Sequence, residues 1–238
     1  MAVNRKIDSL PSESPSRPSR LCRSAPASSI VALRNLLAER FHTTNSSPVN
    51  SQLITGINVL DQRGSLTKGA ITELTSPEPS AGSALLVHCL LQVALRDRFF
   101  LALVDGRDSF DVQSAGSAAL AHLFWIRCQT IPQAMKATDL LLRDGNFPLV
   151  ILDLVLNSPE ELRRIPAASW YRLQRLVEGS STAFLVMSRH NLVPSARIKL
   201  VLENRWQLGD LEDDDALSRL PLTVRRSQLA LPAAVEGR

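Results

Sequence analysis

From residue 53 onward, short apolar runs alternate with longer segments of helical periodicity, and this alternation limits the possible folds more than any other feature. Residues 99–104 (FFLALV), 148–154 (PLVILDL) and 183–188 (AFLVMS) are largely apolar at consecutive positions. Such runs are typical of strands buried on both faces, because a half-exposed sheet alternates apolar and polar residues. The pattern predicts an α/β fold, with a mostly parallel sheet flanked by helices.

The expected elements follow from the same pattern. Strands are predicted over residues 70–74, 99–104, 124–128, 148–154 and 183–188, and helices over residues 82–95, 115–123, 131–143 and 169–177. Three later pieces, residues 198–202, 206–208 and 222–226, alternate only in part. We interpret them as an antiparallel C-terminal extension at one edge of the sheet.

The ends of the chain differ in composition from this core, which we place at residues 53–228. Residues 1–28 are rich in Ser, Pro and Arg, a composition typical of a disordered basic tail. Residues 29–52 are predicted to form a helix, with Ile30 and Phe41 on its apolar face, and then a linker. This helix either docks on another subunit or packs on its own domain. Residues 229–238 are a C-terminal tail.

Charge and cysteine content exclude several classes of function. Residues 1–28 carry +3 of the net charge of +4, so the core has no strong basic signal for nucleic acid. The three cysteines are sparse and unspaced, which favours a reducing cytoplasm and no cysteine-based zinc site. The four histidines have no metal-ligand spacing, so no metal is expected. No apolar run reaches the ~20 residues of a membrane span.

Several segments, taken in order, resemble the RecA/Rad51-type ATPase core. Residues 53–61 look like the segment that leads into that core, and residues 66–74 look like its glycine followed by the first core strand. Residues 150–153 (VILD) look like its Walker B strand, and residues 182–188 like the strand after it. The resemblance spans residues 53–228 and implies a RecA-like fold in which residues 76–83 stand at the P-loop.

The residues at this P-loop position are not those that bind phosphate in an ATPase. A P-loop needs glycines where its backbone curls around phosphate, a lysine for the β- and γ-phosphates, and a hydroxyl for Mg²⁺. Aligned without gaps, Ser76 and Ala81 replace the two glycines, Gly82 replaces the lysine, and Ser83 keeps the hydroxyl. A shift by one restores Gly82 as a glycine but puts Ser83 at the lysine position. We therefore predict no cofactor and no ATP hydrolysis.

Two further positions are interpreted through the same resemblance. Asp153 occupies the Walker B place, where it either coordinates Mg²⁺ through water or is a relic carboxylate that caps a neighbouring loop; without the lysine we favour the relic. Arg107, between Asp105 and Asp108, stands where RecA has an acidic residue that activates water. A cation cannot act as that base. No catalytic residue is predicted.

Within this superfamily the chain is most similar to the ImuA-type accessory proteins of SOS mutagenesis. The similarity is carried by Leu33-Arg34, Glu39-Arg40-Phe41, Ser109-Phe110-Asp111 with Ser114-Ala115, residues 123–128 (LFWIRC), Arg164-Ile165-Pro166 and residues 170–173 (WYRL). It implies a non-catalytic adaptor in DNA-damage-induced translesion synthesis. Its partners would be RecA, an inactive Y-family polymerase homologue and an error-prone replicative-type polymerase.

Two other functions remain open. A SulA-type division inhibitor, which binds the tubulin-like division protein, shares the RecA-like ancestry and also lacks nucleotide chemistry. A residual RecA-like ATPase is the third hypothesis. The loop at residues 188–194 is short and lacks glycine, whereas the corresponding loop of RecA is long and rich in glycine. This difference disfavours filament-type DNA binding but leaves direct contact with DNA open. A basic group, Arg163, Arg164, Arg172 and Arg175, either contacts phosphate or an acidic partner or is a solvated helix face.

Overall fold

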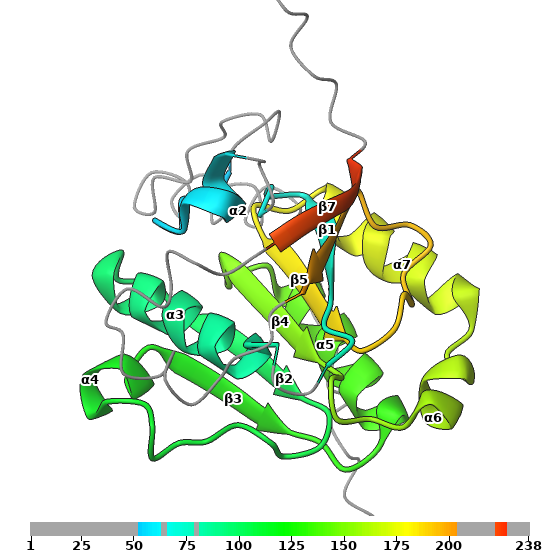
Figure 1. Ribbon diagram of the computed structural model, residues 1–238, viewed down its shortest axis with the longest axis horizontal. Helices are drawn as coiled ribbons and strands as arrows, with labels where there is room; N and C mark the ends of the chain where they lie inside the picture. The colour runs from blue at the N-terminus through cyan, green and yellow to red at the C-terminus, as the bar shows by residue number, and fades with distance from the viewer. Residues whose placement is uncertain (1–51, 63–65, 79–80, 204–221, 228–238) are drawn as a thin grey trace, which may run out of the picture. The chain divides into compact units, whose positions relative to one another are not determined.

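Seven strands form one sheet in the order β3-β2-β4-β5-β1-β6-β7 (Figure 1). The computed structural model describes residues 52–62, 66–78, 81–203 and 222–227. The strands are β1 (Ala70–Thr75), β2 (Leu101–Asp105), β3 (Leu123–Arg127), β4 (Leu149–Asp153), β5 (Ala183–Ser188), β6 (Ile198–Leu202) and β7 (Leu222–Ser227). The predictions for residues 1–51 and 229–238 lie outside the described residues.

Strands β1 to β6 run parallel to their neighbours, which confirms the predicted α/β, RecA-like fold. One part of the strand prediction was wrong. Residues 198–202 form β6, which pairs parallel with β1, because the loop after β5 returns the chain to the amino edge of the sheet. Residues 206–208 lie outside the described residues, and β7 pairs antiparallel with β6.

Helices cover both faces of the sheet (Figure 1). They are α2 (Asn58–Gln62), α3 (Ser83–Arg96), α4 (Ser117–Leu120), α5 (Ile131–Asp144), α6 (Pro159–Arg163) and α7 (Ala167–Glu178). The helix predicted over residues 115–123 is much shorter, because Gly116 caps its start and β3 already begins at Leu123. The short helix α6 was not predicted.

The core has two main layers, one on each face of the sheet. The layer on the α3 face contains Leu74 and Leu90, and the layer on the α5 and α7 face contains Ile71 and Trp170. Ile71 and Leu74 belong to the same strand but to opposite layers, as the period of two along a strand requires. The Trp170 side chain is 2% exposed and packs within the core.

Local sequence signals set the ends of the helices. Thr130 and Gln133 form a capping box at the start of α5, and Gly145 ends this helix in the left-handed conformation at φ 71°, which glycine adopts without strain. Ser158 and Glu161 form a second capping box at α6. Both helices begin at the carboxyl edge of the sheet, after β3 and β4, so these caps fix the backbone beside the candidate site.

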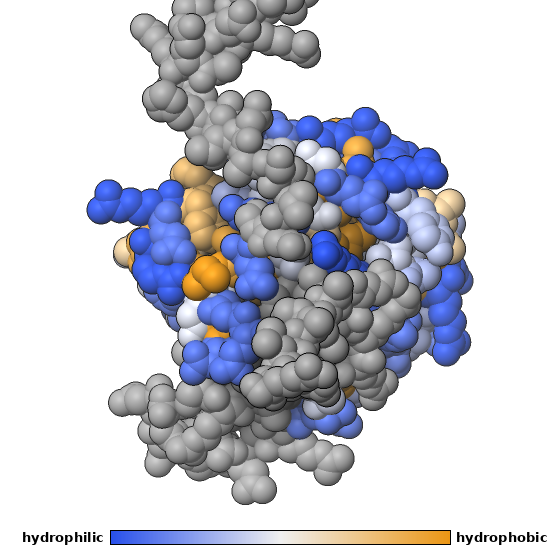
Figure 2. All heavy atoms as spheres, turned by 90° about the horizontal axis from the view of Figure 1, so that it is seen from above, coloured by the Kyte–Doolittle hydropathy of each residue, from blue (hydrophilic) through white to orange (hydrophobic). Residues whose placement is uncertain are grey.

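Polar residues dominate the face of the molecule shown in Figure 2, and hydrophobic side chains gather in a smaller area at its left. In the part of the chain that the structure describes, none of the helices has the length and hydropathy to cross a bilayer. Large apolar side chains with about half their surface exposed are few there and include Phe100, Phe124 and Leu156.

Candidate functional site

The carboxyl ends of the parallel strands meet at one edge of the sheet, where α/β proteins bind ligands. Thr75 at the end of β1 pairs with Ser188 at the end of β5, and Asp105 at the end of β2 pairs with Asp153 at the end of β4. The fold therefore brings residues 76–83, Asp153 and the residues after β2 to the same edge.

Several polar groups of residues 76–83 bond to the chain itself. The Ser76 N–H donates to the carbonyl of Ser188 at 2.8 Å, and the Ala81 N–H donates to the carbonyl of Glu78 at 3.2 Å. The Ser76 hydroxyl donates to the same Glu78 carbonyl, and the guanidinium of Arg189 donates to the carbonyl of Pro77. Ser76 and Ala81 are both fully buried, so neither offers an accessible surface to a ligand.

Four of the eight residues 76–83 offer no free backbone N–H group. A phosphate-binding nest needs several successive N–H groups that point inward. Pro77 and Pro79 have no N–H, and the N–H groups of Ser76 and Ala81 are already bonded. The loop can therefore present fewer donors than the same length of chain in a P-loop.

Gly82, which stands at the lysine position in the alignment without gaps, has a backbone conformation that disfavours a lysine. It is the N-cap of α3, with φ 97° and ψ 17° and no side-chain capping bond. Residues with a Cβ are strained in this left-handed region. Ser83, which keeps the P-loop hydroxyl, begins α3 and is 8% exposed.

Asp105 organises the loop that follows β2. Its buried carboxylate accepts hydrogen bonds from the N–H groups of Arg107, Ser109 and Phe110. It also accepts bonds from the Ser109 hydroxyl and, at 3.3 Å, from the indole N–H of Trp125. A carboxylate with this many internal donors acts as a structural anchor, because its lone pairs are already engaged.

Asp153 is partly buried beside Asp105, and its Oδ1 accepts the Val155 N–H at 3.0 Å. Burial raises the pKa of its carboxyl to about 6; the charge of Asp105 adds to this rise and the Val155 N–H opposes it. The bond to Val155 caps the turn after β4.

Arg107 forms an ion pair with Glu161 of α6 at 2.6 Å. Glu161 also accepts the N–H of Ser158 within its capping box. These interactions hold the pKa of the Glu161 carboxyl below its usual value, with the backbone bond from Ser158 as the largest cause. The neighbouring Asp108 pairs with Arg127 of β3. Both Arg107 and Asp108 are thus joined to other elements.

A buried ion pair near this edge was missed by sequence reasoning. Glu73 of β1 is fully buried, and its Oε2 lies 2.7 Å from the ammonium of Lys199 on β6. Its Oε1 accepts the N–H groups of Leu192 and Val193. The loop between β5 and β6 is therefore tied to the sheet. The sequence signal that could have indicated this ion pair is Glu73 itself, an acidic residue within the predicted strand at residues 70–74 (AITEL).

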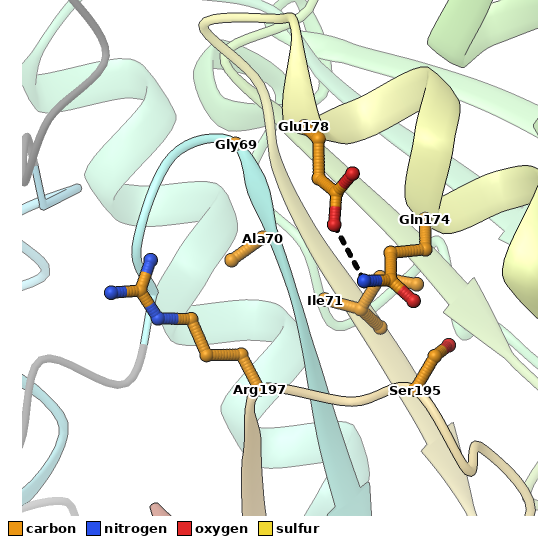
Figure 3. Close-up of a pocket in the computed structure, with 7 residues that line it drawn as sticks. All are labelled: Gly69, Ala70, Ile71, Gln174, Glu178, Ser195 and Arg197. Carbon is orange, nitrogen blue, oxygen red and sulfur yellow. Dashed lines mark hydrogen bonds between the residues drawn. The ribbon is translucent and has the colours of Figure 1, made fainter. Parts of the chain in front are cut away.

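A cavity of about 300 Å³ lies at the opposite edge, where β1 begins (Figure 3). Gly69, Gln174, Glu178, Ser195 and Arg197 are among its lining residues. Figure 3 shows the guanidinium of Arg197 pointing away from the Glu178 carboxylate, which accepts a bond from Gln174. The two charges do not converge on one point, so this cavity has no acid–base arrangement. In the described ranges no group of three or more His, Cys, Asp or Glu could hold a metal ion.

Comparison with known proteins agrees with this architecture. The chain is 31% identical over 102 residues to the RecA protein of Ruegeria pomeroyi, covering 42% of this chain and 29% of that protein. It is 27% identical over 110 residues to RecA of Cytophaga hutchinsonii (45% and 31%) and 28% identical over 102 residues to RecA of Bordetella avium (42% and 29%). The chain thus matches less than a third of the length of these relatives. No protein-family model matches it. This weak homology supports a RecA-like core.

Proposed function

We propose that this protein is a non-catalytic RecA-like adaptor of the ImuA type, acting in the cytoplasm in DNA-damage-induced translesion synthesis. Its proposed partners are RecA, an inactive Y-family polymerase homologue and an error-prone replicative-type polymerase. An adaptor of this kind uses the surfaces of a RecA-like domain for recognition and needs no cycle of ATP binding and hydrolysis.

The observation that carries the proposal is the state of residues 76–83. The segment has no lysine, and its Ser76 and Ala81 N–H groups bond to carbonyls of the chain. The β- and γ-phosphates of a nucleotide need a lysine or an equivalent cation at this place. The Arg189 guanidinium, a cationic group beside this loop, is bonded to the Pro77 carbonyl.

The surroundings of Arg107 support the same proposal. Hydrolysis needs a group that accepts a proton from, or orients, the attacking water. Arg107 has no such capacity, and its ion pair with Glu161 also engages a neighbouring carboxylate. The residual ATPase hypothesis would therefore need a base from another element.

The partners can be tested by purifying the tagged protein from its native cells after DNA damage and identifying the bound proteins by mass spectrometry. The proposal expects an inactive Y-family polymerase homologue, with or without RecA. Recovery of the tubulin-like division protein without a polymerase would instead support the SulA-type function.

The absence of catalysis needs a separate assay. We expect no ATP turnover above a buffer control, with or without single-stranded DNA. Steady turnover that disappears in Asp153→Ala would contradict the proposal, because it would show that the Asp153 carboxylate is needed for ATP hydrolysis. Turnover that persists in this variant would indicate a contaminating ATPase.

A further inference from the structure

A groove of about 370 Å³ lies between the first turn of α5 and the segment that joins α6 to α7. Ile131, Pro132 and Met135 line it from α5, and Arg164, Ile165 and Pro166 line it from the other side. It opens at the carboxyl edge of the sheet, because α5 and α6 follow the carboxyl ends of β3 and β4. The groove therefore belongs to the same edge as the degenerate P-loop but is formed by other elements.

The groove has an apolar lining with a fixed backbone. Ile131 is 7% exposed and packs into the core, while Met135 and Ile165 pack against that core and stay partly exposed. The capping boxes at Thr130 and Ser158 hold the two sides. A preformed apolar groove of this size suits one large apolar side chain, which loses little entropy on binding.

The charge at the rim is positive. Arg163 and Arg164 are exposed, and within the described segments neither has an ion-pair partner, whereas Arg172 of α7 pairs with Asp139 at 2.9 Å. Glu161, the one carboxylate in the lining, is paired with Arg107. Within this group of arginines, Arg172 therefore has an internal partner, whereas Arg163 and Arg164 are available to bind a ligand.

We propose that this groove binds a peptide segment of a partner protein in which one large apolar side chain is flanked by aspartate or glutamate. The apolar side chain fills the space between Met135 and Ile165, and a neighbouring carboxylate pairs with the guanidinium of Arg164. A buried apolar anchor beside an arginine is the arrangement that dominates binding energy at protein interfaces. Nucleic acid fits less well, because the lining is mostly apolar and the basic rim is short.

This inference rests on the proposed function in one respect, since it assigns the adaptor a docking surface. It also gives a role to Arg164-Ile165-Pro166, which have no place in a nucleotide site. The groove can be tested without any cellular partner, so its failure and that of the adaptor function can be told apart.

The test is a titration of the full chain, labelled with ¹⁵N, with a synthetic peptide of sequence Asp-Asp-Leu-Phe-Asp-Asp. We expect saturable shifts of the Ile131, Met135, Ile165 and Ser169 amide signals. Arg164→Glu should weaken binding about tenfold or more by reversing the charge at the anchor, and Ser169→Trp should do the same by filling the groove. Circular dichroism checks that each variant is folded.

Matched controls separate the groove from general charge attraction. Arg175→Glu, on α7 outside the groove lining, should change the affinity by less than about twofold. A peptide with serine in place of Leu-Phe should bind about tenfold more weakly than the parent. Equal losses in Arg164→Glu and Arg175→Glu, shifts outside the groove, or no binding at millimolar peptide would overturn the proposal.

Two other occupants give distinct results. If the acidic run of this chain at residues 210–215 fills the groove, replacing its aspartates and glutamate by Asn and Gln will tighten peptide binding. If a second copy fills it, sedimentation will show self-association that Arg164→Glu abolishes. Either result would overturn the proposal of a partner peptide. Recovery of the polymerase homologue by the tagged protein despite a failed titration would leave the adaptor function standing.

Discussion

Glu73 and Lys199 face each other from adjacent parallel strands, with 2.7 Å between the glutamate Oε2 and the lysine Nζ. Glu73 is fully buried and Lys199 nearly so. Removing one partner of such a pair leaves the other charge in a medium of low dielectric, which costs more than the intact pair gains. The pair also fixes the loop after β5, because Glu73 accepts two N–H groups of that loop.

Replacing Lys199 by methionine is expected to lower the free energy of unfolding by about 3 kcal/mol, since Glu73 loses its cation but stays buried. Urea denaturation measures this change. The exposed Lys136→Met is the matched control, with an expected change within ~0.5 kcal/mol. The double variant Glu73→Leu with Lys199→Met should regain part of the loss. Equal effects of Lys199→Met and Lys136→Met would show that the pair does not matter for stability.

Asp105→Asn should destabilise the loop after β2 by about 2 kcal/mol, because an amide oxygen cannot replace both carboxylate oxygens and the new NH₂ would face N–H donors. Urea denaturation gives the loss, and tryptophan emission should change because Trp125 donates to Asp105. Asp111→Asn provides the control, since Asp111 is exposed and its carboxylate accepts, among the described residues, only the Gln113 N–H at 2.9 Å. A normal stability for Asp105→Asn would mean that the loop holds without this carboxylate.

Asp153→Asn should change how stability depends on pH. The folded pKa of about 6 lies above the unfolded value of ~3.9, so the folded state binds the proton more tightly. The resulting stabilisation is complete below about pH 4 and is lost as the pH rises through about 6. The asparagine side chain does not titrate, so the variant would lack this loss, and its amide oxygen could still accept the Val155 N–H. Between pH 4 and 7 the variant should therefore gain about 1 to 3 kcal/mol relative to the parent. Parallel pH profiles would refute the raised pKa.

Gly106→Ala tests the close approach of the β2 and β4 ends. A Cβ at Gly106 would clash with the Asn157 Oδ1 and would lie 2.8 Å from the Asp153 carbonyl oxygen. Backbone atoms cannot move aside cheaply, so we expect a loss of about 2 kcal/mol. Gly179→Ala is the control, because nothing lies within 4 Å of a Cβ there. Thermal unfolding of both variants measures this loss. Similar melting temperatures would show that a Cβ at Gly106 is accommodated without a clash.

The parts of this fold that could be predicted are those encoded locally. The apolar run at residues 148–154 located β4 because a strand buried on both faces must be apolar throughout. The helical periodicity of residues 131–143 similarly located α5, which spans Ile131–Asp144. The direction of β6 could not be predicted, because alternation reports which residues are buried and not which strand lies alongside. The prediction of an antiparallel piece at residues 198–202 failed for that reason.

Some features of the candidate site are likewise encoded in short segments, whereas others arise only from the folded arrangement. The place of Asp153 at the end of its strand and the missing lysine are properties of short segments, so the sequence was sufficient for both. The ion pair of Arg107 with Glu161 joins residues far apart in the chain, and the groove of Ile131 and Ile165 needs two segments in contact. Only the folded arrangement gives their distance and hence their chemistry.

The left-handed backbone at Gly82 has a consequence for the evolutionary options of this chain. In the alignment without gaps, a mutation that introduced lysine there would supply an ammonium group but would place a Cβ in a strained conformation, at a cost of about 1 to 2 kcal/mol. A mutation that first relaxed the loop would gain nothing, because no cation would yet be present. A route to a nucleotide-binding loop therefore needs several changes, of which the first is unfavourable or without benefit. Selection acting one substitution at a time has little access to such a route.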